Sequence, residues 1–123
     1  MTNEEIGREL VDLANTDRSL DAVDKLYAQD IVSIEGPGAA LQQRIEGFAD
    51  VRAKSVWWYE NHETHSSKAM GPFCGHREDQ FAVLFEMDVT NKPSGERTQI
   101  TEVGLYTVAD GQIVQEEFLY QMG

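Results

Sequence analysis

The chain has 123 residues and a formal net charge of −12, and 41% of its residues are apolar. This length and composition predict one domain, spanning residues 1–123, that is large enough to bury a hydrophobic core. A strongly acidic chain repels phosphate backbones and anionic lipid. We therefore expect neither nucleic acid nor a membrane surface among its partners.

Cys74 is the single cysteine, so the chain has no Cys/His framework for a metal and no intramolecular disulfide. No apolar run approaches the roughly 18 residues of a membrane helix, and the acidic N-terminus is unlike a signal peptide. His62 and His65 are three apart, which places them on opposite faces of a strand and argues against joint ligation of a metal. We expect a cytoplasmic protein with no metal and no cofactor.

Three helices are predicted before residue 62. Thr2 and Glu5 have the spacing of a capping box, and apolar residues at helical spacing then predict a helix over residues 3–15. A second helix ends at Asp30, and a third covers residues 48–61. The apolar stripe of the second helix consists of Leu20, Val23, Leu26 and Tyr27.

Five strands are predicted, most of them in the second half of the chain. The first is a short β-branched run, Ile31–Glu35, followed by a Gly36-Pro37-Gly38 turn and a loop over residues 39–46. The others cover residues 62–70, ending at a break at Gly71-Pro72, and then residues 80–90, 97–108 and 112–120. Helices followed by hairpin-connected strands predict an α+β fold, with helices on one face of a mostly antiparallel sheet. A rolled sheet of this kind leaves a cleft between its concave face and the helices.

Three segments carry a resemblance to known proteins: LYAQDIVSIEGPG, EGFADVRAKSVWW and YTVADGQIVQEEFLY. In these segments the chain resembles the SnoaL-like families of the nuclear transport factor 2-like superfamily, which includes ketosteroid isomerases. The resemblance implies a cone-shaped, strongly curved sheet with a pocket at its open end, and a homodimer packed through the sheet. This scaffold hosts isomerases, hydrolases, cyclases, dehydratases and non-catalytic binders, so the resemblance does not define the activity.

Glu35 stands where ketosteroid isomerases carry their general base, a carboxylate at the end of the first strand. The proton donors of those enzymes do not carry over. Their first-helix tyrosine falls near Val11, and their protonated aspartate falls near Gly104. The resemblance therefore implies a carboxylate base at Glu35 without the usual oxyanion donors.

The turn at residues 109–111 determines which carboxylate faces the pocket. A three-residue loop, Ala109-Asp110-Gly111, would place Glu116 on the same face as Glu102 and Tyr106. A loop of Asp110 and Gly111 alone would shift the register by one and place Glu117 there instead. We favour the three-residue loop, because it keeps the hairpin pattern of the superfamily.

The predicted pocket wall combines apolar and charged side chains. The apolar side chains of the concave face are Phe81, Val83, Phe85, Met87, Tyr106 and Phe118, with Trp58 as a further wall residue. Three carboxylates, Glu35, Glu102 and Glu116, interrupt this surface, and Lys54 is a candidate charge partner. His65 is a candidate acid or base. Each of these residues has a plain alternative as a surface or core side chain.

We therefore expect a homodimeric protein that binds a small-molecule ligand. As an enzyme it would isomerise, cyclise, dehydrate or hydrolyse a small apolar substrate of steroid or polyketide type, without a cofactor. Glu35 would be the base, with His65 or Tyr106 as proton donor. One alternative is a non-catalytic ligand binder or accessory subunit. Another is a dimerising domain whose pocket is filled by its own Trp57, Trp58 and phenylalanine side chains.

Overall fold

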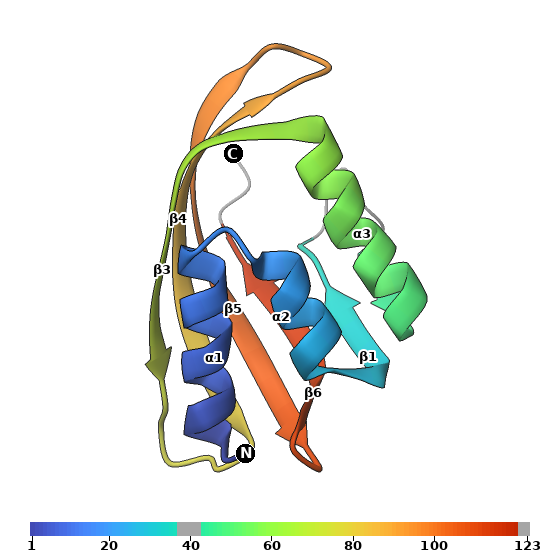
Figure 1. The fold of residues 1–123 in the computed structure, drawn as a ribbon, viewed down its shortest axis with the longest axis vertical. Coiled ribbons are helices and arrows are strands. Elements are labelled where there is room, and N and C mark those ends of the chain that lie inside the picture. Colours follow the sequence, from blue (N-terminus) through green and yellow to red (C-terminus); the bar gives the residue numbers. More distant parts are fainter. Residues whose placement is uncertain (37–42, 121–123) are drawn as a thin grey trace.

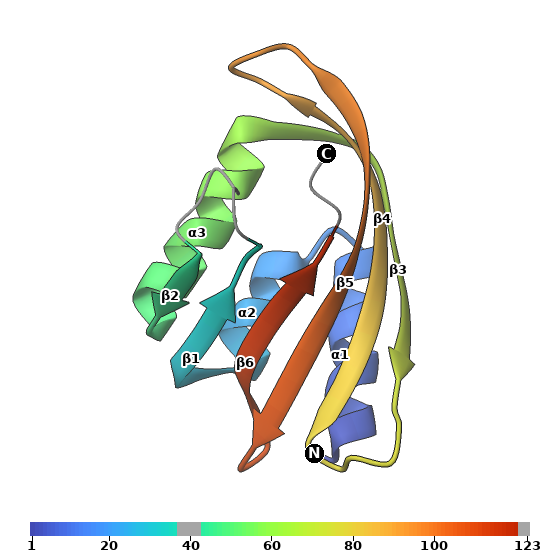
Figure 2. The ribbon, with the colours of Figure 1, turned by 180° about the vertical axis from the view of Figure 1, so that it is seen from behind.

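The computed structural model describes residues 1–36 and 43–120, which form three helices and a six-stranded mixed, mostly antiparallel sheet. The helices cover the concave face of the curved sheet (Figure 1), and the view from behind shows its outer face (Figure 2). The helices are α1 (Asn3–Asn15), α2 (Ser19–Leu26) and α3 (Phe48–Asn61). The strands are β1 (Tyr27–Ile34), β2 (Arg44–Glu46), β3 (His62–Phe73), β4 (Gln80–Asn91), β5 (Arg97–Ala109) and β6 (Gln112–Leu119).

The helix starts follow local sequence signals. The predicted capping box is present at α1, because the Glu5 backbone N–H donates to Thr2 Oγ1 at 3.2 Å and the Thr2 N–H donates to Glu5 Oε1 at 3.0 Å. The predicted bounds of α1 and α3 are confirmed. The predicted end of α2 is wrong, because the chain becomes extended at Tyr27, which pairs with Ile113 of β6. None of the helices in the described ranges is long and apolar enough to cross a membrane.

The sheet has the order β2-β1-β6-β5-β4-β3, with β1 parallel to β6 and every other pair antiparallel (Figure 2). Two predictions about its edges are wrong. Residues 44–46 form β2 and not a loop, and β3 continues past the predicted break at Gly71-Pro72. A register shift between Met70 and Phe73 absorbs the irregularity there. The predicted turn at Gly36-Pro37-Gly38 and the loop up to residue 42 lie outside the described residues, except for Gly36.

The β5–β6 hairpin has a loop of two residues, not the three that we predicted. Asp110 and Gly111 have φ angles of 52° and 75°, as a two-residue type I′ turn requires. A bulge then adds one residue to β6, because Thr107 pairs with Gln115 while Val108 pairs with Ile113. The short loop and the bulge together place Glu116 on the same face as Tyr106, as the longer loop would have done, although Tyr106 pairs with Glu116 and not with Val114.

The core lies between the sheet and the helices, with most of its helical members on α1 and α2 and Val51 on α3. Its fully buried members include Ile6, Ile31, Val51, Phe81, Val83 and Ile113. Gly7 lets α1 approach β3 closely, because a Cβ atom at Gly7 would lie 2.6 Å from Pro72 Cβ. This core closes one end of the space beneath the sheet, and the side chains that surround the remaining space form the candidate site.

Candidate functional site

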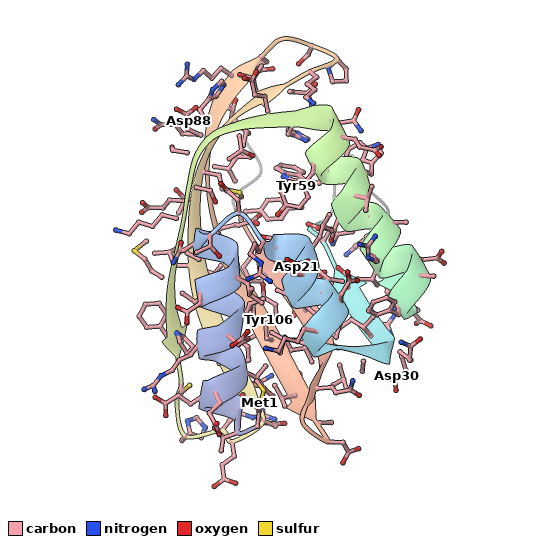
Figure 3. All side chains as sticks on the ribbon, in the orientation of Figure 1. Met1, Asp21, Asp30, Tyr59, Asp88 and Tyr106 are labelled. Atoms are coloured by element: carbon pink, nitrogen blue, oxygen red, sulfur yellow. The ribbon has the colours of Figure 1, made fainter. Side chains whose placement is uncertain are left out.

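A cavity of about 500 Å³ lies between the concave face of the sheet and the helices. Its wall is mainly aromatic and aliphatic, as is usual for small-molecule sites. The aromatic wall residues include Trp57, Trp58, Tyr59, Phe85, Tyr106 and Phe118. Tyr59 lies on the inner side of α3, and Tyr106 lies on the face of β5 that the helices cover (Figure 3). The cavity also contains Glu35, Glu102 and Glu116 with a single lysine, Lys54.

Glu35 is held in one orientation at the wall of this cavity. Its backbone N–H donates to the Gln43 carbonyl oxygen at 2.7 Å, which positions the residue just after β1. Lys54 Nζ lies 2.6 Å from Glu35 Oε1, and the two side chains are only 8% and 11% exposed, respectively. The Tyr120 hydroxyl donates to Glu35 Oε2 at 2.8 Å. Burial, followed by the hydrogen bond and charge of Glu35, raises the pKa of Tyr120 to about 12, so this phenol stays protonated as a donor.

Glu116 anchors the buried side of the same network. Its side chain is 3% exposed and accepts hydrogen bonds from the Tyr27 hydroxyl and from Ser33 Oγ, the latter at 2.6 Å. Lys54 Nζ donates to Ser33 Oγ at 2.5 Å and lies 3.6 Å from Glu116 Oε2. Burial is the main reason why the pKa of Tyr27 is well above its usual value, and the charge of Glu116 adds to it. These contacts satisfy the buried carboxylate and direct the ammonium group of Lys54 between Glu35, Ser33 and Glu116.

Glu102 differs from the other two carboxylates because it has no hydrogen-bond partner among residues 1–36 and 43–120. It projects from β5, opposite Phe85 of β4, and lines the cavity. Burial raises its pKa to about 7, the charge of Glu35 adds to this increase, and Lys54 opposes it. A carboxyl group that is half protonated near neutral pH can both donate and accept a proton, which is the property of a general acid or base.

Most of the side chains predicted for the pocket line the cavity, but His65 does not. The lining residues that we predicted are Glu35, Lys54, Trp58, Phe85, Met87, Glu102, Tyr106, Glu116 and Phe118, whereas Phe81 and Val83, also predicted for the pocket wall, are buried in the core. His65 is exposed, with Nε2 at 2.7 Å from Thr90 Oγ1, and the β3–β4 register shifts at this residue. His65 therefore does not line the cavity, because it is the extra residue at the irregularity of β3 and its ring is exposed to solvent.

Residues of the site that escaped the sequence prediction include Tyr27, Ser33 and His62. His62 stacks on Trp58 with ring centroids 3.7 Å apart, and its Nδ1 donates to the Trp58 carbonyl oxygen at 2.9 Å, so it braces the wall of the cavity. Strand alternation places Tyr120 on the same face as Glu116 and Phe118, and Tyr120 lines the cavity. The other three depend on where β1 and β3 begin and on contacts between distant strands.

A family model for the SnoaL-like domain matches residues 1–120. The chain belongs to the SnoaL-like domain family. A proposed SnoaL-like polyketide cyclase from Mesorhizobium loti has 41% sequence identity to this chain, and its crystal structure superposes with a TM-score of 0.90. The match covers 98% of this chain and 100% of that chain. No curated protein matches the sequence.

More distant structures share the nuclear transport factor 2-like fold of this SnoaL-like domain. A nuclear transport factor 2-like protein of unknown function from Burkholderia pseudomallei is 19% identical, with a TM-score of 0.74 over 98% of this chain and 92% of that chain. A computationally designed 17-OHP binder is 14% identical, with a TM-score of 0.72 over 99% of this chain and 95% of that chain. At these identities the similarity shows the fold alone.

Proposed function

We propose that this SnoaL-like protein binds a small, largely apolar molecule in its cavity and carries out cofactor-free acid–base chemistry on it, with Glu35 as the base. The observation that carries this proposal is the fixed, nearly buried carboxylate of Glu35 in a mostly apolar cavity. Glu102, whose pKa is about 7, lines the same cavity. The pair matches what proton transfer requires, a positioned base and a second group that changes protonation state near neutral pH.

Glu35 keeps the capacity to accept a substrate proton. A carboxylate offers about four lone-pair positions, whereas Lys54 and Tyr120 each occupy one position, on different oxygens. The two contacts also fix the orientation of the carboxylate, which lowers the entropic cost of reaching a reactive geometry. Glu35 would remove a proton from the ligand, and Glu102 would deliver one to it.

The relative from Mesorhizobium loti supports chemistry that rearranges a carbon skeleton. That protein is a proposed polyketide cyclase and matches this chain from end to end at 41% identity. Cyclisation, isomerisation and dehydration of a small apolar molecule all require a base that removes a proton and an acid that returns one. We propose that this chain performs a reaction of this group.

Ligand binding without catalysis is the second candidate function. It is favoured by the direct contact between Lys54 and Glu35, because an ammonium group at 2.6 Å competes with a substrate proton for the carboxylate. In that case Glu35 and Lys54 would together bind a polar group of the ligand. Binding would then be observed with no chemical change in the ligand.

The test is a panel of apolar two-ring ketones, lactones and allylic alcohols, followed by proton NMR in deuterium oxide for exchange, isomerisation and dehydration. Glu35→Gln keeps the shape of the side chain and removes its basicity, so we expect turnover to fall about 100-fold or more. Glu86→Gln is the matched control, because Glu86 is exposed on β4. Wild-type turnover in Glu35→Gln would refute a base at this position, and binding without turnover in the wild type would support the second function.

A further inference from the structure

The cavity carries more negative charge than its own lining residues neutralise. Two of its three carboxylates, Glu35 and Glu116, have the ammonium group of Lys54 at 2.6 and 3.6 Å, respectively. Among the described residues Lys54 is the one lysine or arginine that lines the cavity, and residues 37–42 and 121–123 contain no lysine, arginine or histidine. The third carboxylate, Glu102, forms no salt bridge within residues 1–36 and 43–120.

Aromatic rings surround Glu102 in the cavity. Phe85 is its cross-strand partner on β4, so the two side chains stand opposite each other on the concave face. The charge of Glu102 also adds to the raised pKa of three phenols, for which burial is the main cause, so their rings lie within reach of its field. These phenols are Tyr59 on the inner side of α3 (Figure 3), Tyr106 on β5 and Tyr120 after β6. The rings therefore come from both the helix side and the sheet side of the cavity.

A cation can reach this part of the cavity from solvent. Tyr59 lines the cavity and is 42% exposed, and Trp57 of the same helix also lines it and is 37% exposed. These two rings therefore border the opening of the cavity. The formal net charge of −12 raises the local concentration of cations around the protein.

A carboxylate among aromatic rings has the chemistry of an ammonium site. The face of an aromatic ring attracts a cation, and groups of rings recognise quaternary ammonium ions in this way. The carboxylate adds a charge interaction that is stronger in a partly buried position than in water. An anionic ligand would meet three carboxylates instead, and a neutral ligand would leave Glu102 without a charge partner.

We propose that Glu102 and the rings around it bind the positively charged group of an apolar ammonium ion, whose carbon framework occupies the apolar part of the cavity. The inference goes beyond the proposed function, because it adds a second class of ligand. A cation beside Glu102 favours the ionised carboxylate, so it displaces the proton that Glu102 would deliver to a substrate. The ammonium ion is therefore an inhibitor if the protein is an enzyme, and the bound ligand itself if the protein is a binder.

Equilibrium dialysis of two matched probes tests the proposal. The (2-naphthylmethyl)trimethylammonium ion and 2-neopentylnaphthalene have the same shape, because the first has a quaternary nitrogen where the second has a quaternary carbon. The charge of the first probe does not depend on pH. At pH 8 we expect the wild type to bind the cation about tenfold more tightly than the neutral probe.

Glu102→Gln tests the role of the carboxylate, because it keeps the shape of the side chain and removes its charge. We expect it to weaken binding of the cation about tenfold at pH 8 and to leave binding of the neutral probe nearly unchanged. Phe85→Leu should likewise weaken binding of the cation more than binding of the neutral probe. Glu86→Gln is the matched control, because it removes the same charge from an exposed position on β4 and should leave the preference unchanged.

The preference for the cation should also fall between pH 8 and pH 5.5, because Glu102, whose pKa is about 7, gains a proton over this range. Other titratable groups border the same cavity, so the fall is assigned to Glu102 only if Glu102→Gln removes it. These groups are Tyr27 and Glu35 at β1, Lys54 and Tyr59 on α3, His62 on β3, Tyr106 on β5, and Glu116 and Tyr120 at β6.

A urea titration of each variant verifies folding, so that lost binding is not mistaken for lost structure. The proposal is overturned if the wild type binds the two probes equally at pH 8, if it binds the neutral probe more tightly, or if it binds neither. It is also overturned if Glu102→Gln keeps the preference, or if Glu86→Gln loses as much of it. In the last case the net charge of the protein, and not the cavity, would attract the cation.

These outcomes are separate from those of the proposed function. Loss of turnover in Glu35→Gln, together with equal binding of the two probes, overturns the ammonium site and leaves the base in place. A preference for the cation that depends on Glu102, together with no turnover of any compound in the panel, supports the ammonium site and binding without catalysis. Turnover that the cation inhibits supports both proposals.

Discussion

The carboxyl group of Glu102, which makes no hydrogen bond within residues 1–36 and 43–120, should make the folded protein less stable as the pH rises. Its pKa increases from a reference value of 4.5 to about 7 on folding. The folded state therefore binds this proton more tightly than the unfolded state, and its contribution is greatest below pH 4.5 and is lost as the pH rises through 7. At about 1.36 kcal/mol for each pH unit, the loss amounts to about 3 kcal/mol.

The perturbation that isolates this contribution is Glu102→Gln, which keeps the size of the side chain and removes its ionisation. Relative to the wild type, the free energy of unfolding of the variant should rise by up to about 3 kcal/mol between pH 4.5 and pH 8. Urea denaturation followed by the fluorescence of Trp57 and Trp58 measures this difference at each pH.

Glu86→Gln is the control, because its exposed carboxylate lies on the outer face of the same sheet. We expect a much smaller difference from the wild type, because this side chain is exposed to solvent. A Glu102→Gln difference that is constant with pH would refute the reasoning, because the carboxyl group would then have the same proton affinity in the folded and unfolded states. A difference that falls as the pH rises would refute it as well.

Two further predictions concern packing and buried hydrogen bonds. Tyr27→Phe removes a donor from the buried carboxylate of Glu116, so urea denaturation should show a loss of about 1.5–3 kcal/mol, whereas Tyr106→Phe should lose less than ~0.5 kcal/mol because its hydroxyl makes no hydrogen bond within the described part of the chain. Equal losses in the two variants would contradict the hydrogen-bond assignment. Gly7→Ala places a Cβ atom 2.6 Å from Pro72 Cβ, so thermal and urea denaturation should show a loss of about 1–3 kcal/mol, and an unchanged stability would show that α1 does not pack so closely on β3.

The elements that were predicted correctly are those with strong local signals. The capping box of Thr2 and Glu5 marks the start of α1, and strict alternation from Phe81 to Val89 marks β4. Such signals depend on neighbours in sequence, so they can be recognised without knowledge of the tertiary structure. The cone-shaped α+β fold followed from these elements together with the family resemblance.

The errors occur where distant strands decide the local structure. Tyr27 continues the apolar stripe of α2, so its helical periodicity is intact, but pairing with Ile113 makes it the first residue of β1. The two-residue loop at Asp110-Gly111 alone would turn Glu117 to the face of Tyr106, and the bulge in β6 returns Glu116 to that face. The alternation of side chains along the two strands does not distinguish a three-residue loop from a two-residue loop followed by a bulge. The predicted face was therefore right although the predicted loop was wrong.

The candidate site shows the same limit. Alternation along β5 and β6 placed Glu102, Tyr106 and Glu116 together, and the structure confirms that they share a face. His65 was misplaced because an irregularity in β3 has no clear sequence signature. The contact between Lys54 and Glu35 joins a helix to the end of a distant strand, so the sequence suggested the partners but could not provide the distance.

The central claim is that the cavity beneath the sheet is where this protein meets a small molecule, with Glu35 and Glu102 facing it. Carbon-13 NMR of the glutamate side-chain carboxyl groups tests this directly, with resonances assigned from Glu35→Gln, Glu102→Gln and Glu86→Gln. When the tightest-binding compound of the panel is added, the resonances of Glu35 and Glu102 should shift and that of Glu86 should not. Saturable binding that leaves both cavity resonances unchanged would contradict the account.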